Sequence, residues 1–200
     1  MAEDPRKSIV SYLKKIGVAR AKDFVNLGIA REYLSRLVED GTLIRTSRGV
    51  YRLADDSISE FGHFAEIAKR VDGGVVCLLS ALRFHEIGTQ NPSEVWLAIH
   101  RRSRKPNIDY PALQVVWFSG KAFTEGIEYH KIDGARIAIY SIAKTVADCF
   151  KYRNKIGIDV CIEALRDSLE KRRVKPDKIW HYASVCRVNT IIRPYMEALL

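Results

Sequence analysis

The chain has 200 residues, with 33 Lys and Arg against 24 Asp and Glu, which gives a formal net charge of +9. Apolar residue types make up 47% and charged types 28%, a globular composition that excludes a disordered tail and a fibrous repeat. The length suffices for one large domain or two small ones. The positive charge favours a polyanionic partner, above all nucleic acid, with an acidic protein or a membrane surface as rivals.

Several other classes of protein are excluded by the sequence. No apolar stretch approaches the ~20 residues that a membrane span needs. The first residues lack the basic and then apolar pattern of a signal peptide. The four cysteines lie far apart without C-x-x-C spacing, so we expect buried, reduced thiols and no zinc ribbon. We therefore expect a cytoplasmic protein without a membrane partner.

A short polar and acidic stretch at 54–60 separates a strand-like run from a helical pattern. We place a domain boundary there, which predicts an N-terminal domain of residues 1–56 and a C-terminal domain of residues 60–200. The first 56 residues contain 11 Lys and Arg and 8 Asp and Glu, so this part carries only +3 of the net charge. The basic surface of the second domain therefore needs an explanation of its own.

The first domain reads as three helices followed by a hairpin. Apolar residues recur at helical spacing in segments 5–16, 21–27 and 30–40. Gly28 provides a tight turn between the second and third helices. Two strand-like runs, 43–46 and 50–53, flank a short loop in which Gly49 can take a positive φ. This order predicts a winged helix-turn-helix.

The third helix would present one face to the core and the other to DNA. A rotation of about 100° per residue points Leu34, Leu37 and Val38 inward. Arg31 and Arg36 point outward, where they can donate to guanine edges or phosphates. Arginines also recur along the hairpin, where they can approach a phosphate backbone. The alternative is a purely structural domain with a solvated basic face. The predicted DNA-binding residues are Arg31, Tyr33, Ser35, Arg36, Arg45, Arg48 and Arg52.

The second domain mixes helical and strand-like patterns. A helix is expected at 60–71, a strand or the start of a helix at 75–79, and a short helix at 81–86 with Ser80 as its N-cap. Four strands are expected at 94–99, 113–118, 126–132 and 135–140. The last two are joined by an Asp-Gly hairpin turn. Further helices are expected at 141–152, 158–171, 176–186 and about 189–199. The fold class is therefore α+β, with a small, mostly antiparallel sheet packed by several helices.

Three stretches carry a family resemblance: GIAREYLSRLVEDGTLIR (28–45) with RGVYRL (48–53), CLLSALRFHEIGTQNPSEVWLAI (77–99), and SIAKTVADCF (141–150). Together they resemble the AbiEi antitoxins, the regulatory partners in type IV toxin–antitoxin systems of abortive infection, a form of phage defence. The first stretch is shared by many winged helices, and the second is the distinctive one. The three motifs span most of the chain in the order that the family has.

The resemblance implies two activities. The winged helix would bind inverted repeats in the promoter of its own operon and act as a repressor, with cooperative binding to paired sites. The C-terminal domain would counteract a nucleotidyltransferase-type toxin, directly or indirectly. The resemblance also admits a stand-alone transcriptional regulator, and the sequence leaves the oligomeric state open.

No catalytic motif is evident in the chain. None of the five histidines has the spacing of a metal site, and no phosphate loop or nucleophile elbow occurs. A DNA-targeted nuclease, the second alternative, would use Asp109, Glu128 and Lys131 around a metal, but the usual acid-x-Lys spacing is absent. We therefore expect no enzymatic activity, no catalytic residue, no metal and no cofactor.

A basic run follows the strand at 94–99 and ends at Pro106, so we expect an exposed loop there. Charge runs are ordinarily solvated surface. The alternative is a second nucleic-acid or toxin-related surface, which would contact DNA beside the operator or the RNA on which the toxin acts. The residues of this surface would be Arg101, Arg102, Arg104 and Lys105.

Overall fold

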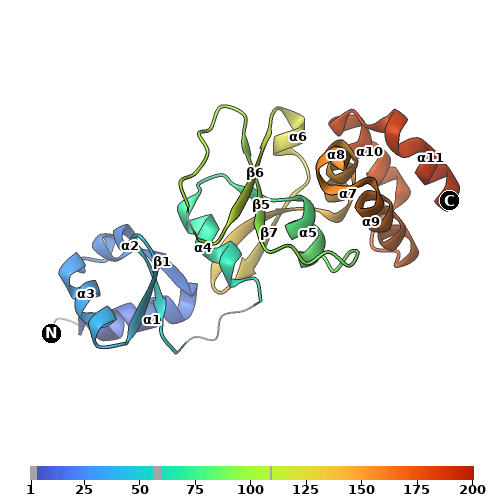
Figure 1. Cartoon of the computed structure of the whole chain (residues 1–200). Coiled ribbons are helices and arrows are strands. Elements are labelled where there is room, and N and C mark those ends of the chain that lie inside the picture. The colour runs from blue at the N-terminus through green and yellow to red at the C-terminus, as the bar shows by residue number, and fades with distance from the viewer. Residues whose placement is uncertain (1–3, 56–59, 109) are drawn as a thin grey trace. The chain divides into compact units, whose positions relative to one another are not determined.

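The computed structural model describes residues 4–55, 60–108 and 110–200. Its contacts divide the chain into two compact units, residues 1–72 with 130–137 and residues 73–129 with 138–200. The colour bar of Figure 1 allows the residue ranges of each unit to be located along the chain. Residues 56–59, where the sequence predicts the domain boundary, lie outside the described residues, so that boundary stays a prediction.

The first unit begins with three helices, α1 (Pro5–Ile16), α2 (Ala21–Asn26) and α3 (Arg31–Glu39). All three were predicted, with bounds that agree to within about a residue. Gly28 separates α2 from α3 with φ +78°, which a glycine adopts without steric cost. The helices close a core of fully buried side chains, among them Ile9, Leu13, Phe24 and Leu34.

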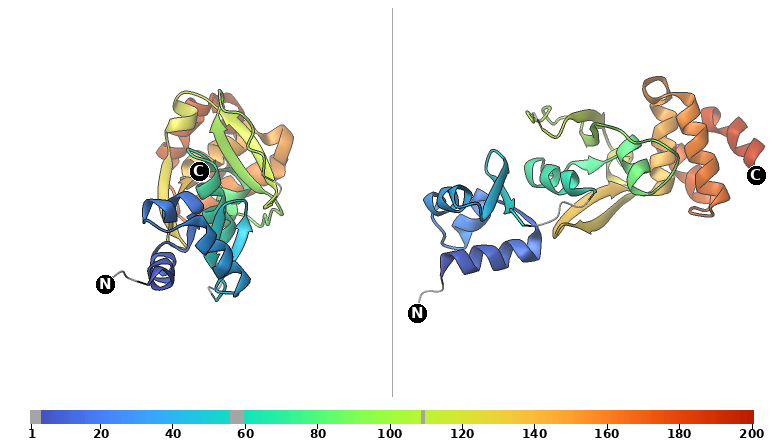
Figure 2. Two further views of the ribbon diagram at one scale, coloured as in Figure 1. Left: turned by 90° about the vertical axis from the view of Figure 1, so that its left-hand side faces the viewer. Right: turned by 60° about the horizontal axis from the view of Figure 1, so that its bottom comes forward.

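A three-stranded antiparallel sheet completes this part of the first unit. Strands β1 (Val18–Arg20), β2 (Leu43–Ser47) and β3 (Val50–Leu53) form it in the order β1-β3-β2. The predicted hairpin is present, and Gly49 in its turn has φ +74°. Strand β1 was not predicted, because three residues are too short to show a period of two. The order helix, strand, helix, helix and hairpin is that of a winged helix-turn-helix (Figure 2). Helix α4 (Gly62–Arg70) follows.

The larger sheet has five strands, β4 (Val75–Val76), β5 (Val95–His100), β6 (Leu113–Phe118), β7 (Ile127–Ile132) and β8 (Ala135–Tyr140), in the order β6-β5-β4-β8-β7. Strands β4 and β5 are antiparallel, but β4 pairs with β8 and β5 with β6 in parallel. The sheet is therefore mixed, where the sequence predicted a mostly antiparallel one. Parallel partners need a crossover. The described residues between β5 and β6 form no helix, so the sequence there gave no sign of a crossover.

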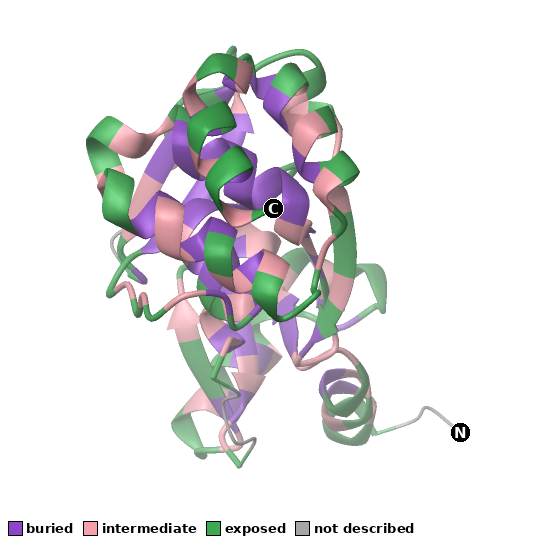
Figure 3. Cartoon of the chain, turned by 90° about the vertical axis from the view of Figure 1, so that its right-hand side faces the viewer, coloured by how far each residue is buried: buried purple, intermediate pink, exposed green. Residues whose placement is uncertain are grey.

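Seven helices of the described residues belong to the second unit: α5 (Leu78–Phe84), α6 (Lys121–Thr124), α7 (Ile142–Lys151), α8 (Arg153–Ile156), α9 (Ile158–Glu170), α10 (Pro176–Cys186) and α11 (Asn189–Leu199). Their apolar faces form one core with the sheet, and Figure 3 shows the buried stripes along the C-terminal helices. The predicted α+β fold is therefore confirmed. The short helices α6 and α8 were not predicted.

One predicted cap is wrong. Cys77, not Ser80, is the N-cap of α5. Ser80 is buried within the helix, where its Oγ accepts a hydrogen bond of 2.9 Å from the backbone N–H of Trp96 on β5. This hydrogen bond links α5 to β5. It also gives the backbone N–H of Trp96 the acceptor that a buried donor needs.

The core of the second unit contains an ion pair. Lys144 and Asp148, one turn apart on α7, are both 0% exposed and pair through Nζ and Oδ2. Cys186 on α10 donates a hydrogen bond of 3.1 Å from Sγ to Oδ1 of Asp148. The Lys144 ammonium also lies 4.1 Å from the ring centroid of Tyr140. Burial raises the pKa of Asp148, and the neighbouring Lys144 charge counteracts that rise.

Two other expectations concern the whole chain. All four cysteines, Cys77, Cys149, Cys161 and Cys186, are free and buried, as predicted. Across the described ranges, no helix combines the length and apolar character that crossing a membrane requires.

Candidate nucleic-acid interface

Helix α3 has the two faces that the sequence predicts. Leu34 and Leu37 are 0% and 3% exposed and belong to the core of the first unit. Arg31, Ser35 and Arg36 are exposed. A recognition helix needs this division, because it must stay attached to its domain while its outer face enters the major groove.

The N-terminus of α3 carries positive charge that favours a bound anion. Arg31 is the first helical residue, and the N-cap Ala30 provides no side-chain hydrogen bond to the helix N-terminus. Backbone N–H groups at such a terminus attract phosphate through their partial positive charge. An arginine at the first position adds a full charge at the same end.

The acidic C-cap of α3 interacts with other residues of the first unit. Asp40, the C-cap, accepts a hydrogen bond of 2.9 Å from the Thr42 N–H and lies 3.5 Å from the guanidinium of Arg6. The hydrogen bonds from Thr42, with a smaller effect of Arg6, lower the pKa of Asp40. Its negative charge is therefore engaged at the end of the helix farthest from Arg31.

The hairpin contributes two further exposed arginines. Arg45 lies on β2 beside a register shift of the ladder, and Arg48 lies in the turn. Like Arg31 and Arg36, they form no ion pair or side-chain hydrogen bond with any residue in the described part of the chain. A guanidinium left without a protein partner is free to bind phosphate or a base edge.

Two of the predicted DNA-binding residues, Tyr33 and Arg52, are only partly exposed. Tyr33 is partly buried and packs against the core of the first unit. Arg52 lies on the central strand β3, is partly buried, and donates from Nη1 to the carbonyl of Leu53 at 3.1 Å. The structure thus brings four arginines to the surface of α3 and the wing, while Tyr33 packs on the core and Arg52 hydrogen-bonds to the backbone. Their roles in DNA binding stay predictions.

The predicted basic loop is exposed, as expected. Residues 101–105 are all exposed, and Arg101 is anchored by its N–H, which donates to the carbonyl of Phe118 at 2.8 Å. The N–H of Arg102 donates to Nδ1 of His100 at 3.3 Å. The loop therefore begins from a fixed position at the end of β5.

Arg101 also lines a cavity that sequence reasoning missed. This cavity of about 620 Å³, which we call the basic pocket, lies in the second unit and includes Trp117, Lys121, Lys151 and Arg187 among its lining residues. These residues lie up to 86 positions apart along the chain. No local motif could have indicated them, because the ends of β5, β6, α7 and α10 and the start of α6 bring them together.

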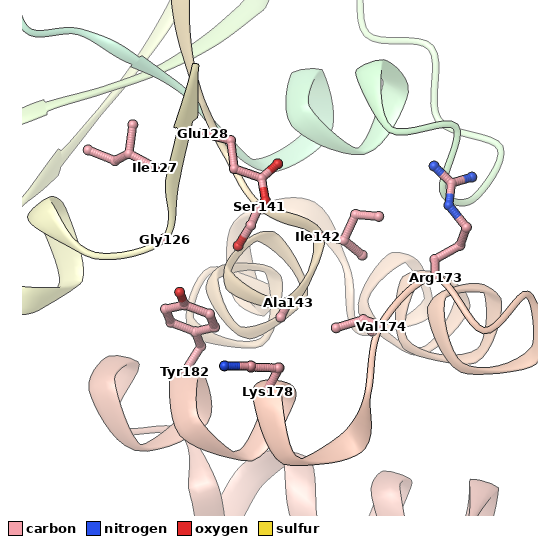
Figure 4. Close-up of a pocket in the computed structure, with 10 residues that line it drawn as sticks. All are labelled: Gly126, Ile127, Glu128, Ser141, Ile142, Ala143, Arg173, Val174, Lys178 and Tyr182. Carbon is pink, nitrogen blue, oxygen red and sulfur yellow. The ribbon is translucent and has the colours of Figure 1, made fainter. Parts of the chain in front are cut away.

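A second cavity of about 440 Å³ lies at the start of α7 (Figure 4). Lys178 and Tyr182 of α10 line it opposite Ser141, and Arg173 and Glu128 complete its charged groups. The buried hydroxyl of Ser141 has no hydrogen-bond partner among the described residues. Because this cavity contains both acidic and basic groups, its charge does not favour one class of ligand.

The residues considered for a nuclease do not form a metal site in what the structure describes. No group of three His, Cys, Asp or Glu side chains among the described residues could hold a metal ion. Asp109 lies outside the described residues. The geometry therefore adds no support to the nuclease alternative.

A protein of known crystal structure has a similar fold over nearly the whole chain. The fold is similar to the crystal structure of the RV2827C protein from Mycobacterium tuberculosis, with a TM-score of 0.53 over 98% of this chain and 80% of that one. The two sequences are 14% identical, so this similarity concerns the fold alone. No curated protein matches the chain.

The N-terminal elements match a family model. The match covers residues 9–54, from the first turns of α1 to the end of β3, and the model describes a transcriptional regulator, AbiEi antitoxin. It therefore contains α3 and both strands of the wing, which carry the four arginines that form no ion pair with other described residues. Residues 9–54 of this chain thus match the AbiEi family of antitoxin transcriptional regulators.

Proposed function

We propose that this protein is the antitoxin of a type IV toxin–antitoxin pair and represses its own operon by binding promoter DNA through α3 and the wing. One observation carries the DNA-binding part of the proposal. Arg31, Arg36, Arg45 and Arg48 are exposed on the helix and hairpin of a winged-helix arrangement, without ion pairs to other described residues.

The physical roles of these residues differ. Arg31 and Arg36 lie on the exposed face of α3, where bidentate hydrogen bonds to guanine provide about 1–3 kcal/mol of discrimination each. Arg48 lies in the hairpin turn, a position suited to the phosphate backbone, where each contact adds affinity without sequence preference. Helix contacts would thus determine the operator, and wing contacts would strengthen binding to any duplex.

The antitoxin activity is assigned to the second unit. The match of residues 9–54 to antitoxin regulators supports a partner toxin, and the sequence resemblance in 77–99 and 141–150 extends that support into the second unit. We propose that this unit counteracts a nucleotidyltransferase-type toxin encoded beside it, directly or through the RNA on which the toxin acts.

Co-expression with the adjacent gene tests the antitoxin proposal. Induction of that gene alone should arrest growth, and co-expression of the full chain should restore it. The variant Arg31→Ala with Arg36→Ala should also restore growth when both genes are driven by foreign promoters, because neutralisation is assigned to the second unit.

Two outcomes would contradict the proposal. Growth arrest that persists with the full chain would leave a stand-alone regulator. The absence of arrest by the adjacent gene, together with metal-dependent cleavage of plasmid DNA by this protein, would favour the nuclease alternative.

A further inference from the structure

The hairpin of β7 and β8 contributes residues to both compact units. Its two strands belong to the five-stranded sheet, in which β8 lies between β4 and β7. Residues 130–137 around its turn nevertheless belong to the first unit, which is otherwise formed by residues 1–72. The unit that contains the winged-helix arrangement therefore includes a segment that is distant from it in sequence.

The turn of this hairpin packs against the C-terminal end of α1, backbone against backbone. A Cβ built on Gly134 would overlap the backbone of Ile16, and a Cβ built on Gly17 would overlap the backbone carbonyl of Asp133. Backbone atoms cannot rotate away as a flexible side chain can. This close approach therefore requires glycine on both sides of the contact.

A positive φ alone does not explain the glycine of the turn. Gly134 has φ +72° and Gly41, in the same unit, has φ +74°, so the two positions share one backbone preference. A Cβ built on Gly41 would meet nothing within 4 Å. Packing therefore constrains Gly134 in addition to its φ, and Gly41 provides a matched comparison.

The contact lies where α1 passes into β1. Gly17 is the C-cap of α1, and its N–H donates to the Leu13 carbonyl at 2.7 Å. Leu13 belongs to the core that also contains Leu34 of α3. The next residue, Val18, begins β1, which pairs with β3, the central strand of the small sheet. The turn thus contacts the junction between a helix that shares a core with α3 and a strand that pairs with the wing.

The turn and the strands that carry it depend on each other. A two-stranded hairpin is marginally stable at best in water. Ile132, Ala135 and Ile137 flank the turn and are at most 9% exposed, so this part of the hairpin is covered by protein. The paired strands give the turn its shape, and packing against α1 holds the turn in place.

We propose that the β7–β8 turn is a clamp on the winged helix, which makes the stability of the first unit and its affinity for DNA depend on the larger sheet. While the turn is docked, the junction of α1 and β1 is fixed. When the turn leaves α1, only a fraction of the molecules presents α3 and the wing correctly, and the apparent affinity for DNA falls by that fraction. The statement about DNA rests on the proposed function, and the statement about stability does not.

Urea unfolding of the full chain tests the dependence between the units without DNA. Leu34→Ala destabilises the core of the first unit, which contains no tryptophan, because Trp96, Trp117 and Trp180 all belong to the second unit. The urea midpoint followed by tryptophan emission should nevertheless fall, by about 0.5 M or more. An unchanged midpoint would overturn the proposal.

Matched glycine variants locate the coupling in the turn. Gly134→Ala places a Cβ against the backbone of Ile16, whereas Gly41→Ala has the same φ penalty without the overlap. In the Gly134→Ala background, Leu34→Ala should no longer lower the tryptophan midpoint. In the Gly41→Ala background it should lower the midpoint as in the wild type. Equal behaviour in the two backgrounds would show that the turn does not carry the coupling.

Affinity for DNA upstream of the gene provides a second readout. Gly134→Ala should bind at least about threefold more weakly than Gly41→Ala, with an unchanged salt slope because no phosphate contact is removed. Equal affinity of the two variants would overturn the clamp. Failure of the wild type to bind would contradict the proposed function instead, and the unfolding experiment would then decide the clamp.

A second variant and a second measurement cover a loss of folding. Gly17→Ala disrupts the same contact from the side of α1, and circular dichroism checks the fold of each variant. If neither Gly134→Ala nor Gly17→Ala folds, hydrogen exchange of Leu34→Ala decides the question. Amides of 127–140 should then exchange faster than in the wild type, and unchanged exchange there would overturn the proposal.

Discussion

The buried ion pair on α7 provides a quantitative test of the core of the second unit. Lys144→Met keeps an unbranched apolar chain of similar length but leaves the Asp148 carboxylate without its cation. Both side chains are 0% exposed, so water cannot replace the lost partner. Removing one member of a buried pair costs about 3–5 kcal/mol. For a protein of this size that corresponds to a loss of roughly 6–20 °C in Tm.

The assay can report on the second unit alone. The three tryptophans, Trp96, Trp117 and Trp180, all belong to that unit. Urea unfolding followed by tryptophan emission therefore measures the free energy of unfolding of the unit that contains Lys144. The control is Lys171→Met, which breaks an i, i+4 pair with Asp167 of 2.7 Å whose side chains are 51% and 25% exposed. An exposed pair of this kind contributes about 0–1 kcal/mol.

The cost of Lys144→Met should depend on pH. Lys144 lowers the pKa of Asp148 against the effect of burial, so the variant has a still higher folded pKa. The folded variant then keeps a proton that the unfolded chain releases near its ordinary pKa of 3.8. The stability of both proteins falls as pH rises above that value, because Asp148 also has a raised pKa in the wild type, and it falls further in the variant. The difference from wild type should therefore be smaller at pH 4–5 than at pH 7.

A double variant separates the charge from the packing. Lys144→Met with Asp148→Asn removes both charges and should be more stable at pH 7 than Lys144→Met alone, by about 2 kcal/mol or more. A loss of unfolding free energy for Lys144→Met no larger than that for Lys171→Met would contradict the burial of this pair. An equal loss at pH 4.5 and pH 7 would contradict it as well.

Three further predictions follow from single contacts. Arg48→Ala should weaken binding to specific and unrelated duplexes alike and reduce the salt slope of log K by about 1; an unchanged slope in anisotropy titrations would place Arg48 away from the backbone. Ser80→Ala should cost about 1–3 kcal/mol in urea unfolding, because the Trp96 N–H loses its acceptor; a cost below about 0.5 kcal/mol would show that this bond adds little. Burial raises the pKa values of Cys161 and Cys186 to about 12, so thiol labelling at pH 8 should be far slower in buffer than in urea. Rapid labelling of the native protein would contradict their burial.

The elements that the sequence predicted well are those with strong apolar periodicity or with clear turn residues at their ends. Helix α3 begins after the Gly28 turn and ends at Glu39, before the C-cap Asp40, and its apolar stripe places Leu34 in the core as expected. The Asp133–Gly134 and Gly49 turns were recognisable because each position needs a positive φ. These signals are local, so one sequence suffices to find them.

The features that the sequence did not predict depend on distant partners. The segment at 75–79 was ambiguous between strand and helix, and it is both: β4 ends at Val76, and α5 begins after Cys77. The parallel pairing of β5 with β6 follows from the path of the connection and leaves no local pattern. The basic pocket depends on that pairing, so Arg101 and Arg187 could not be assigned to one pocket from their neighbours in sequence.

The charge distribution acquires a clearer meaning from the structure. The first 56 residues carry only +3, but four of their arginines are exposed and unpaired with other described residues on α3 and the wing. In this unit the position of the charges matters more than their sum. In the second unit the basic pocket gathers part of the remaining charge at the ends of β5 and β6.

The affinity of the protein for DNA upstream of its own gene is the most direct test of the central claim. The comparison is between wild type, Arg31→Ala with Arg36→Ala, and the control Lys14→Ala with Lys15→Ala, which removes two exposed charges from α1. The α3 variant should lose about 1–3 kcal/mol per base contact on the upstream fragment and little on a scrambled one. The α1 control should weaken both fragments equally and slightly. Unchanged preference for the upstream fragment in the α3 variant would contradict the assignment of α3 as the recognition helix.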